Sequence, residues 1–208
     1  MNTGIQDAMN LGWKLAAVLR GRASIDLLDS YEAERHPVGA QVLAMTDAFN
    51  RLVLSRSQAA TQIRQIVMRL MVRLGPIRRR LLGRLSAIDL RYPRQTGDHP
   101  LVGKRALDFT SSAGRLYELL RTGRFVLVVG PQAPEDEVLA TVVPWSNWVM
   151  TVRDDSPHAP TLTLVRPDGY VAWAAEGWTA DRLVAALRRW CGSGILAEPR
   201  PATVELPR

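Results

Sequence analysis

The residues best suited to chemistry stand at the amino end, where Met1-Asn2-Thr3-Gly4 opens a segment with helical spacing. Asn2 or Thr3 can cap that helix, and Asp7 lies early in it, where a negative side chain suits the helix dipole. The free N–H groups of a first helical turn and the positive end of the dipole stabilise an anion. On these residues alone, an ordinary capped helix is the simpler interpretation, and anion binding is the alternative.

The remaining reactive side chains do not combine into a recognisable catalytic or metal site. Cys191 is the single cysteine, which excludes a disulfide framework, a CxxC pair and a thiolate metal cluster, and we interpret it as a small, partly buried residue. The histidines are far apart, lack metal-ligand spacing and are predicted to lie in loops: His36, His99 and His158. Three acids are interpreted as exposed helix charges rather than an acid–base pair: Asp29, Glu32 and Glu34. No catalytic residue is assigned, and no metal is expected.

Helical periodicity runs through the first 90 residues or so. Apolar residues at helical spacing predict a helix over 3–19, which Gly21 ends. A second helix begins near Leu27 and continues to about Leu54, with Pro37 in its first turn or at a kink. A third spans 59–74 with one apolar face, and a short Arg-rich helix is predicted over 77–85. This part of the chain is therefore predicted to be almost wholly helical.

The pattern changes after Tyr92-Pro93. A polar stretch rich in turn-forming residues, 94–105, marks a domain boundary. Beyond it the sequence predicts helices over 114–121, 134–141 and 180–190, and strands over 124–129 and 148–153. A Pro167-Asp168-Gly169 turn between two alternating runs predicts a β-hairpin. The predicted fold class is α/β (α+β overall).

Length and composition bound the kind of protein. The 208 residues, 47% hydrophobic and 23% charged, are enough for one large domain or two small ones with real cores. Disorder and repeat architectures are excluded, and no apolar stretch approaches the ~20 residues of a membrane span. The amino end lacks the basic start and apolar core of a signal peptide, and the lone cysteine suits a reducing compartment. We therefore expect a cytoplasmic protein.

The positive charge is concentrated in one segment. The chain has a formal net charge of +7, but residues 51–94 hold eleven arginines against one acid, Asp89, and carry +10, which leaves −3 elsewhere. This segment raises nucleic-acid binding and an interfacial membrane helix over 63–82 as alternatives. Because Arg69 and Arg73 lie opposite an apolar stripe, and no aromatic residue interleaves the run before Tyr92, both are disfavoured. A solvated helix face, or a surface for an acidic partner domain, is the preferred interpretation.

Four segments carry a family resemblance. Residues 1–15 read MNTGIQDAMNLGWKL and residues 27–39 read LLDSYEAERHPVG, and both closely resemble, in register, the last conserved block of FAD-dependent aromatic hydroxylases. These are the single-component flavoprotein monooxygenases of phenol and polyketide metabolism. Residues 89–93, DLRYP, and 101–108, LVGKRALD, look like later landmarks of the polyketide-hydroxylase branch. The resemblance covers essentially the whole chain.

The resemblance implies a cofactor, an electron donor and a substrate class. These are FAD, NADH or NADPH, and an aromatic small molecule. In that family the loop entering the first helix places backbone amides against the pyrimidine edge of the flavin. The resemblance therefore implies flavin contacts for Met1, Asn2 and Thr3, mainly through the backbone, with Gly4 permitting close approach. For an intact enzyme, the resemblance favours flavin contact over an ordinary capped helix.

Residues 101–192 are similar to thioredoxin in their order of helices and strands. Ala159-Pro160-Thr161 stands where thioredoxins carry a cis-proline, and a hairpin and a closing helix follow it. The redox dithiol is missing, so disulfide exchange by a CxxC mechanism is not available. This fits the hydroxylase branch with a redox-inactive thioredoxin-like C-terminal domain.

Motifs that a flavin hydroxylase needs are missing from the 208 residues: the GxGxxG turn, the Gly-Asp motif and the middle β-rich domain. The resemblance thus implies the end of an FAD-binding domain over 1–93, a linker over 94–110, a thioredoxin-like domain over 111–192 and a flexible tail over 193–208. We expect this portion, whether truncated, mis-started or split, to be inactive alone and to partner an upstream flavin-domain polypeptide. The alternatives are a non-catalytic interaction or dimerisation module and a basic nucleic-acid or membrane-surface binder.

The absence of these motifs and of the middle domain from the 208 residues leads to structural expectations. If the helical segment covers a sheet supplied elsewhere, its apolar stripes should be partly exposed as a large patch. Limited proteolysis should then cut before about residue 100 and leave the later domain whole. The six tryptophans are expected to pack in the core and at its edges rather than form a ligand cage.

Overall fold

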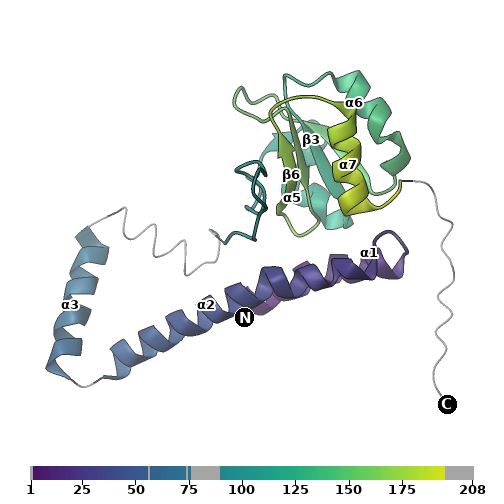
Figure 1. The fold of residues 1–208 in the computed structure, drawn as a ribbon. Coiled ribbons are helices and arrows are strands. Elements are labelled where there is room, and N and C mark those ends of the chain that lie inside the picture. Colours follow the sequence, from purple (N-terminus) through teal and green to yellow (C-terminus); the bar gives the residue numbers. More distant parts are fainter. Residues whose placement is uncertain (1, 56, 74, 76–89, 195–208) are drawn as a thin grey trace, which may run out of the picture.

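The computed structural model describes residues 2–55, 57–73, 75 and 90–194 (Figure 1). Three long helices come first: α1 (Asn2–Leu19), α2 (Asp29–Leu54) and α3 (Gln58–Arg73), with a 3-10 turn η1 (Ile25–Leu27) between α1 and α2. Helices α1 and α2 contact each other beside the domain that contains the strands. Helix α2 extends well beyond that domain before the chain turns into α3 (Figure 1). Three predicted helices are therefore present, and the one predicted over 77–85 lies outside the described residues.

The second half of the chain forms a four-stranded sheet in the order β4-β3-β5-β6. Strand β3 (Phe125–Val129) pairs in parallel with β4 (Val149–Arg153) and antiparallel with β5 (Leu162–Val165), and β5 pairs antiparallel with β6 (Val171–Ala175). Helix α6 (Glu135–Val142) and the turn η3 (Val143–Trp145) connect β3 to β4, and α7 (Ala180–Cys191) follows the hairpin. A β-α-β unit followed by a hairpin and a closing helix is the thioredoxin topology, which confirms the predicted fold class.

A small antiparallel pair, β1 (Thr110–Ser111) and β2 (Gly114–Arg115), precedes α5 (Leu116–Leu119) and the turn η2 (Leu120–Thr122). The predicted helix over 114–121 is wrong at its start. Gly114 has a φ of 118° and pairs with Ser111, so helical geometry begins only at Leu116. Pro160 also departs from thioredoxins, because no described residue follows a cis peptide bond.

Apolar side chains cover both faces of the sheet. All five residues of β3 are buried, as a central strand covered on both sides requires. One cluster joins the sheet to α6 and α7, and the other joins it to α5. Trp13 of α1 belongs to the first cluster, and its ring meets that of Phe125 edge to face with centroids 5.4 Å apart. The other tryptophans of the sequence pack in or against the same cluster, as expected: Trp145, Trp148, Trp173, Trp178 and Trp190.

Residues 90–106 run along the edge of the sheet at β6, and we call them the edge strap. The backbone N–H of Gly103 donates to Val171 O at 3.0 Å, and Val171 N–H donates back to Lys104 O at 2.9 Å. Tyr92 N–H donates to Gly103 O at 2.8 Å, and the Tyr92 ring stacks on Tyr170 with centroids 4.1 Å apart. The strap shares residues with the predicted linker over 94–110, and the domain boundaries stay predictions.

Helix α1 buries two polar residues together with Trp13 and leaves several large apolar side chains exposed. The α1 residues that are buried among those described are Asn10, Trp13 and Lys14, whereas Ile5 is 57% and Met9 54% exposed. Large apolar side chains are also exposed on the other two long helices: Leu43, Phe49, Val53, Leu54, Ile63 and Ile66. Partial exposure of the apolar stripes is thus confirmed, and their joining into one large patch stays a prediction. No helix in the described part of the chain is long and apolar enough to cross a membrane.

Candidate functional site

The first turn of α1 is open on one side. Met1 lies outside the described residues, the helix begins at Asn2, Thr3 is half-buried and Gly4 is exposed. A Cβ atom added to Gly4 would meet no atom within 4 Å, and no acidic side chain lies in this turn. The positive end of the helix dipole is therefore not neutralised locally, which suits a polar or anionic ligand edge. Ligand contacts at these four residues stay a prediction.

Helix α2 holds the other side of this turn. The buried Arg35 donates from Nε to Asp7 Oδ1 at 2.6 Å and from Nη2 to the carbonyl oxygen of Thr3 at 3.4 Å. Burial disfavours the charged guanidinium, but the hydrogen bond to Asp7 prevails and raises the pKa of Arg35. A permanently charged side chain from α2 thus orients the first turn of α1.

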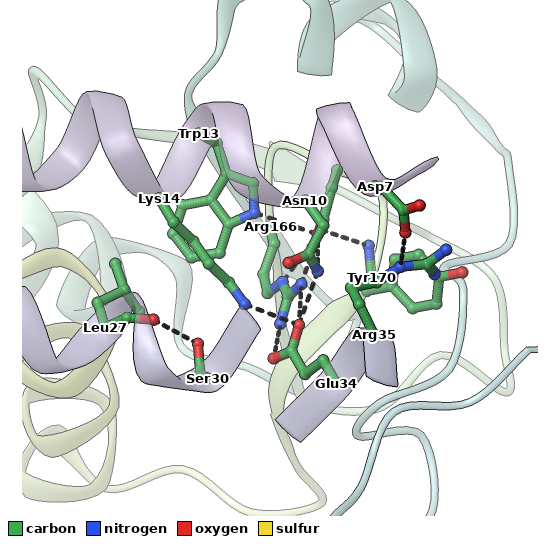
Figure 2. Close-up of polar contacts among 11 residues, drawn as sticks. Asp7, Asn10, Trp13, Lys14, Leu27, Ser30, Glu34, Arg35, Arg166 and Tyr170 are labelled. Carbon is green, nitrogen blue, oxygen red and sulfur yellow. Dashed lines mark hydrogen bonds and ion pairs between the residues drawn. The ribbon is translucent and has the colours of Figure 1, made fainter. Parts of the chain in front are cut away.

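A buried guanidinium, that of Arg166 in the turn between β5 and β6, is the centre of a second polar group (Figure 2). Its Nη1 and Nη2 atoms donate to Glu34 Oε1 at 2.7 Å and Oε2 at 2.9 Å, which forms a two-point fork to α2. The same guanidinium binds Asp168, two residues along the turn, through Nε to Oδ1 at 3.0 Å and through Nη2 to Oδ2. Arg166 therefore joins the hairpin turn to α2.

Helix α1 supplies three further donors to the same two carboxylates (Figure 2). Lys14 Nζ lies 3.0 Å from Glu34 Oε2, and Asn10 Nδ2 donates to Glu34 Oε2 at 2.7 Å and to Asp168 Oδ2 at 3.2 Å. Trp13 donates its indole N–H to Asp168 Oδ2 at 3.1 Å. We call these six residues the polar lock: Asn10, Trp13, Lys14, Glu34, Arg166 and Asp168.

The charges of the polar lock balance, and each carboxylate is fully paired. Burial alone would raise the pKa of Glu34, but hydrogen bonding and attraction from Arg166 lower it. Burial of Arg166 opposes its charge, yet Asp168 and Glu34 raise its pKa. Burial of Lys14 outweighs the attraction of Glu34 and lowers the lysine pKa. The prediction that Glu34 is an exposed helix charge is wrong, because the carboxylate lies between two helices and the hairpin.

A cleft of about 420 Å³ opens beside the first turns of α1, next to the polar lock. Its walls include Gln6 and Met9 from α1 and, from the second half of the chain, Arg105, Tyr117 and Tyr170. Three buried polar atoms on these residues have no hydrogen-bond partner among the described residues: Gln6 Oε1, Arg105 Nε and Tyr170 Oη. The aromatic walls suit a flat ligand or a further layer of protein, whereas these three polar atoms are buried behind the surface of the cleft.

Other predicted candidates do not form a reactive site in the described part of the chain. Cys191 is a free, buried thiol, and burial raises its pKa far above the usual range, so it is not a nucleophile. The prediction of a loop is wrong for His36, which lies in α2, whereas His99 and His158 lie in loops, with His99 Nε2 2.8 Å from Glu176 Oε1. No group of three or more metal-ligating side chains occurs among the described residues. Within the described residues, the polar and charged groups discussed above thus gather around α1.

Comparison with known proteins identifies the family. Residues 99–194 match the model of the aromatic-ring hydroxylase C-terminal domain, and residues 1–46 match that of an FAD-binding domain. The chain is related to the C-terminal portion of the FAD-dependent aromatic-ring hydroxylases. The rifampicin monooxygenase of Rhodococcus hoagii is 38% identical over 92% of this chain, and the anhydrotetracycline monooxygenase of Streptomyces rimosus is 37% identical over 92%. This chain spans 38% and 40% of their respective lengths.

Solved structures of this family share the fold. The anhydrotetracycline hydroxylase OxyS from Streptomyces rimosus superposes with a TM-score of 0.76 at 37% identity, covering 91% of this chain and 40% of that one. CabE, an aromatic hydroxylase from angucycline biosynthesis, gives a TM-score of 0.75 at 38% identity, with coverages of 92% and 40%. The helical segment and the thioredoxin-like domain of this chain therefore recur together in these proteins.

Proposed function

We propose that this chain forms part of an FAD-dependent monooxygenase that hydroxylates aromatic, polyketide-type molecules. The observation that carries the proposal is that residues 1–46 and 99–194 match, in this order, an FAD-binding domain and the C-terminal domain of aromatic-ring hydroxylases. The names of the rifampicin and anhydrotetracycline relatives favour a multi-ring substrate. The free Cys191 suits a reducing compartment, so we also propose a cytoplasmic location.

The first turn of α1 is our assignment for flavin contact. The backbone of Met1, Asn2 and Thr3 would lie against the pyrimidine edge, and Gly4 would allow close approach. The open space at Gly4 and the lack of an acid in this turn support the fit. Helix N–H groups there would stabilise negative charge on a reduced flavin ring. Bound FAD, reduced by NADH or NADPH, would supply the oxygen-transfer chemistry.

The rest of the cofactor site would come from protein outside these residues. None of the 208 residues forms a GxGxxG turn, which binds the FAD pyrophosphate in this class of enzyme. The chain also spans only about two fifths of the length of its relatives. We therefore propose that a flavin-domain polypeptide is its partner, and that these residues alone do not hydroxylate the aromatic substrate.

The test is flavin retention, measured as the absorbance spectrum after incubation with FAD and desalting. We expect no flavin band for the chain alone, and a band when it is co-expressed with the part of the Rhodococcus hoagii relative that it does not cover. Gly4→Val should reduce the retained flavin, because a branched side chain would fill the open space at the first turn. Gly12→Val is the matched control, since Gly12 is also exposed on α1 with open space around it.

Two results would contradict the proposal. Retention that falls equally in Gly4→Val and Gly12→Val would move the flavin contact away from the first turn. A stable complex with the flavin-domain segment that never retains flavin would instead make this chain a non-catalytic interaction module.

A further inference from the structure

Helix α1 is attached to the thioredoxin-like domain mainly through polar contacts. Its large apolar residues Ile5, Met9 and Leu19 are all more than half exposed, and Trp13 is the single apolar side chain of the helix that enters the sheet core in the described residues. Asn10 and Lys14, by contrast, are 0% exposed and aim at Glu34 and Asp168 (Figure 2). The position of the helix therefore depends on the polar lock more than on apolar packing.

The polar lock constrains how α1 and α2 lie against the hairpin. Its two acids and two bases neutralise each other, and all four are buried, so the groups are stable in the folded chain only while each charge stays paired. The planar fork of Arg166 spans both oxygens of Glu34 and also reaches Asp168, and such a match is lost when the partners shift. A rotation or a slide of α1 and α2 against the hairpin would leave a buried charge without its partner.

The constraint extends from the hairpin to the first turn of α1 through neighbouring residues of α2. Glu34 faces the hairpin and binds Arg166, and the next residue, Arg35, faces α1 and binds Asp7 and the Thr3 carbonyl (Figure 2). Because both belong to one rigid helical turn, the guanidinium of Arg166 determines where Arg35 holds the start of α1. Hydrogen bonds at both ends, joined by the α2 backbone between Glu34 and Arg35, thus link Arg166 to Thr3.

We propose that Arg166 is a positioning residue: the thioredoxin-like domain, which has no redox dithiol, acts through the polar lock as a fixed support that orients the flavin-facing end of α1. This inference rests on the proposed function for its reference to the flavin, but the mechanical link does not need a bound cofactor. It gives the thioredoxin-like domain a role that requires no chemistry of its own.

The test is amide hydrogen exchange along the full chain, measured by mass spectrometry for Arg166→Met. We expect exchange in residues 5–19 to accelerate about tenfold or more, because α1 loses its orientation, while the central strand β3 keeps its protection. Arg153→Met is the matched control, since Arg153 forms ion pairs with Glu135 and Asp155 at the surface of the same sheet. It should leave α1 unchanged. Unchanged exchange of α1 in Arg166→Met would overturn the proposal.

Arg166→Lys separates positioning from simple charge balance. A lysine keeps the positive charge but cannot reproduce the fork to Glu34 and the bond to Asp168 together. We expect β3 to stay protected and α1 to remain in faster exchange. Full recovery of α1 protection by lysine would show that only the charge matters and would contradict the proposal.

Glu34→Gln keeps the test decisive if Arg166→Met does not fold, because the hairpin retains its own pair of Arg166 and Asp168. Faster exchange confined to α1 and α2 supports the proposal, and an equal effect on β3, or no effect, contradicts it. In the co-expressed complex, Glu34→Gln should also reduce retained flavin several-fold. If the wild-type complex retains no flavin while α1 responds to these variants, the proposed function fails and the mechanical link stands.

Discussion

At the scale of single residues, Glu34 carries a buried negative charge that depends on its hydrogen-bond donors. Its carboxylate accepts hydrogen bonds from Asn10, Lys14 and Arg166 and is 8% exposed. Although burial opposes the charge, these partners lower the pKa of Glu34 below its ordinary value of 4.5. The folded chain therefore prefers the ionised carboxylate more strongly than the unfolded chain does.

This difference predicts an acid-side loss of stability. Since the folded-state pKa lies below 4.5, the unfolded chain takes up the proton first, and the contribution of Glu34 is complete above pH 4.5 and is lost as the pH falls through the folded-state value. Urea unfolding measured between about pH 6 and pH 3 should show a free energy of unfolding that falls with pH. Glu34→Gln should be less stable at pH 6 and should flatten part of that slope.

Glu118→Gln is the control, because Glu118 is an exposed carboxylate on α5. It should keep both the wild-type stability and the wild-type slope. An acid-side slope as steep in Glu34→Gln as in the wild type would mean that Glu34 does not contribute to it.

The buried charges could not be predicted from hydropathy. The apolar residues of α1 indicate a stripe through Ile5 and Met9, and the usual inference is that such a stripe faces the core. In the structure that stripe is exposed and the adjoining face with Asn10 and Lys14 is inside. Periodicity shows which residues share a face, but the partner that covers a face depends on tertiary contacts, here with a turn more than 150 residues away along the chain.

At the scale of elements, the edge strap depends on glycine where it meets β6. Gly103 has a φ of 76°, in the left-handed region, and a Cβ atom there would collide with the backbone carbonyl of Tyr92. Backbone atoms cannot move aside as a side chain can, and the same residue exchanges hydrogen bonds with Tyr92 and Val171. The strap is therefore anchored at a position that accepts no side chain.

Gly103→Ala should destabilise the chain by about 3 kcal/mol, which combines left-handed strain with the clash. Gly21→Ala is the matched control, because Gly21 has a similar φ of 67° but a Cβ atom there would meet no atom within 4 Å, and it should cost only about 1 kcal/mol. The free energy of unfolding in urea measures both. Equal losses for the two variants would show that the strap does not need close approach at Gly103.

Most strands and helices could be predicted from local pattern, and the exceptions have local causes. The hairpin follows from Pro167-Asp168-Gly169, and Gly169 has the positive φ, 82°, that such a turn requires. Helix α2 agrees with the helix predicted from near Leu27 to about Leu54, and Pro37 lies inside it. The edge strap was missed, because turn-forming residues do not reveal that their backbone pairs with a sheet.

At the scale of the whole molecule, the arrangement separates two kinds of surface. The helical segment meets the thioredoxin-like domain through the polar lock, which includes Trp13, through Leu27, which packs against the sheet core, and through Arg22, which lies over the Trp148 ring. Large apolar residues are exposed along the long helices, and α2 and α3 extend away from this domain (Figure 1). An uncovered apolar surface of this kind is typical of a contact with another protein layer. This placement agrees with the proposed flavin-domain partner, and it leaves the polar lock as the main attachment within the chain.

That attachment can be tested by cutting the chain between its two halves with trypsin. Exposed arginines lie in the stretch that joins the two halves, from the last turn of α2 to the start of the edge strap: Arg51, Arg69, Arg91 and Arg94. Cleavage there should come first and leave the later domain whole. Because Arg166 donates to Glu34, and Asp168 accepts from Asn10 and Trp13, the fragment with α1 and α2 should stay bound to the thioredoxin-like domain on a native sizing column.

The same digestion in Arg166→Met decides whether the polar lock or apolar contact holds the halves together. Loss of the guanidinium leaves Glu34 and Asp168 buried with Lys14 as the only cation of the lock, and an unpaired buried charge costs about 3 to 5 kcal/mol. The cut fragments of this variant should separate, whereas those of Arg153→Met should co-elute as in the wild type. If the Arg166→Met fragments also co-elute, Trp13 and its contact with Phe125 suffice to hold the helices, and the polar lock would orient α1 without being needed to attach it.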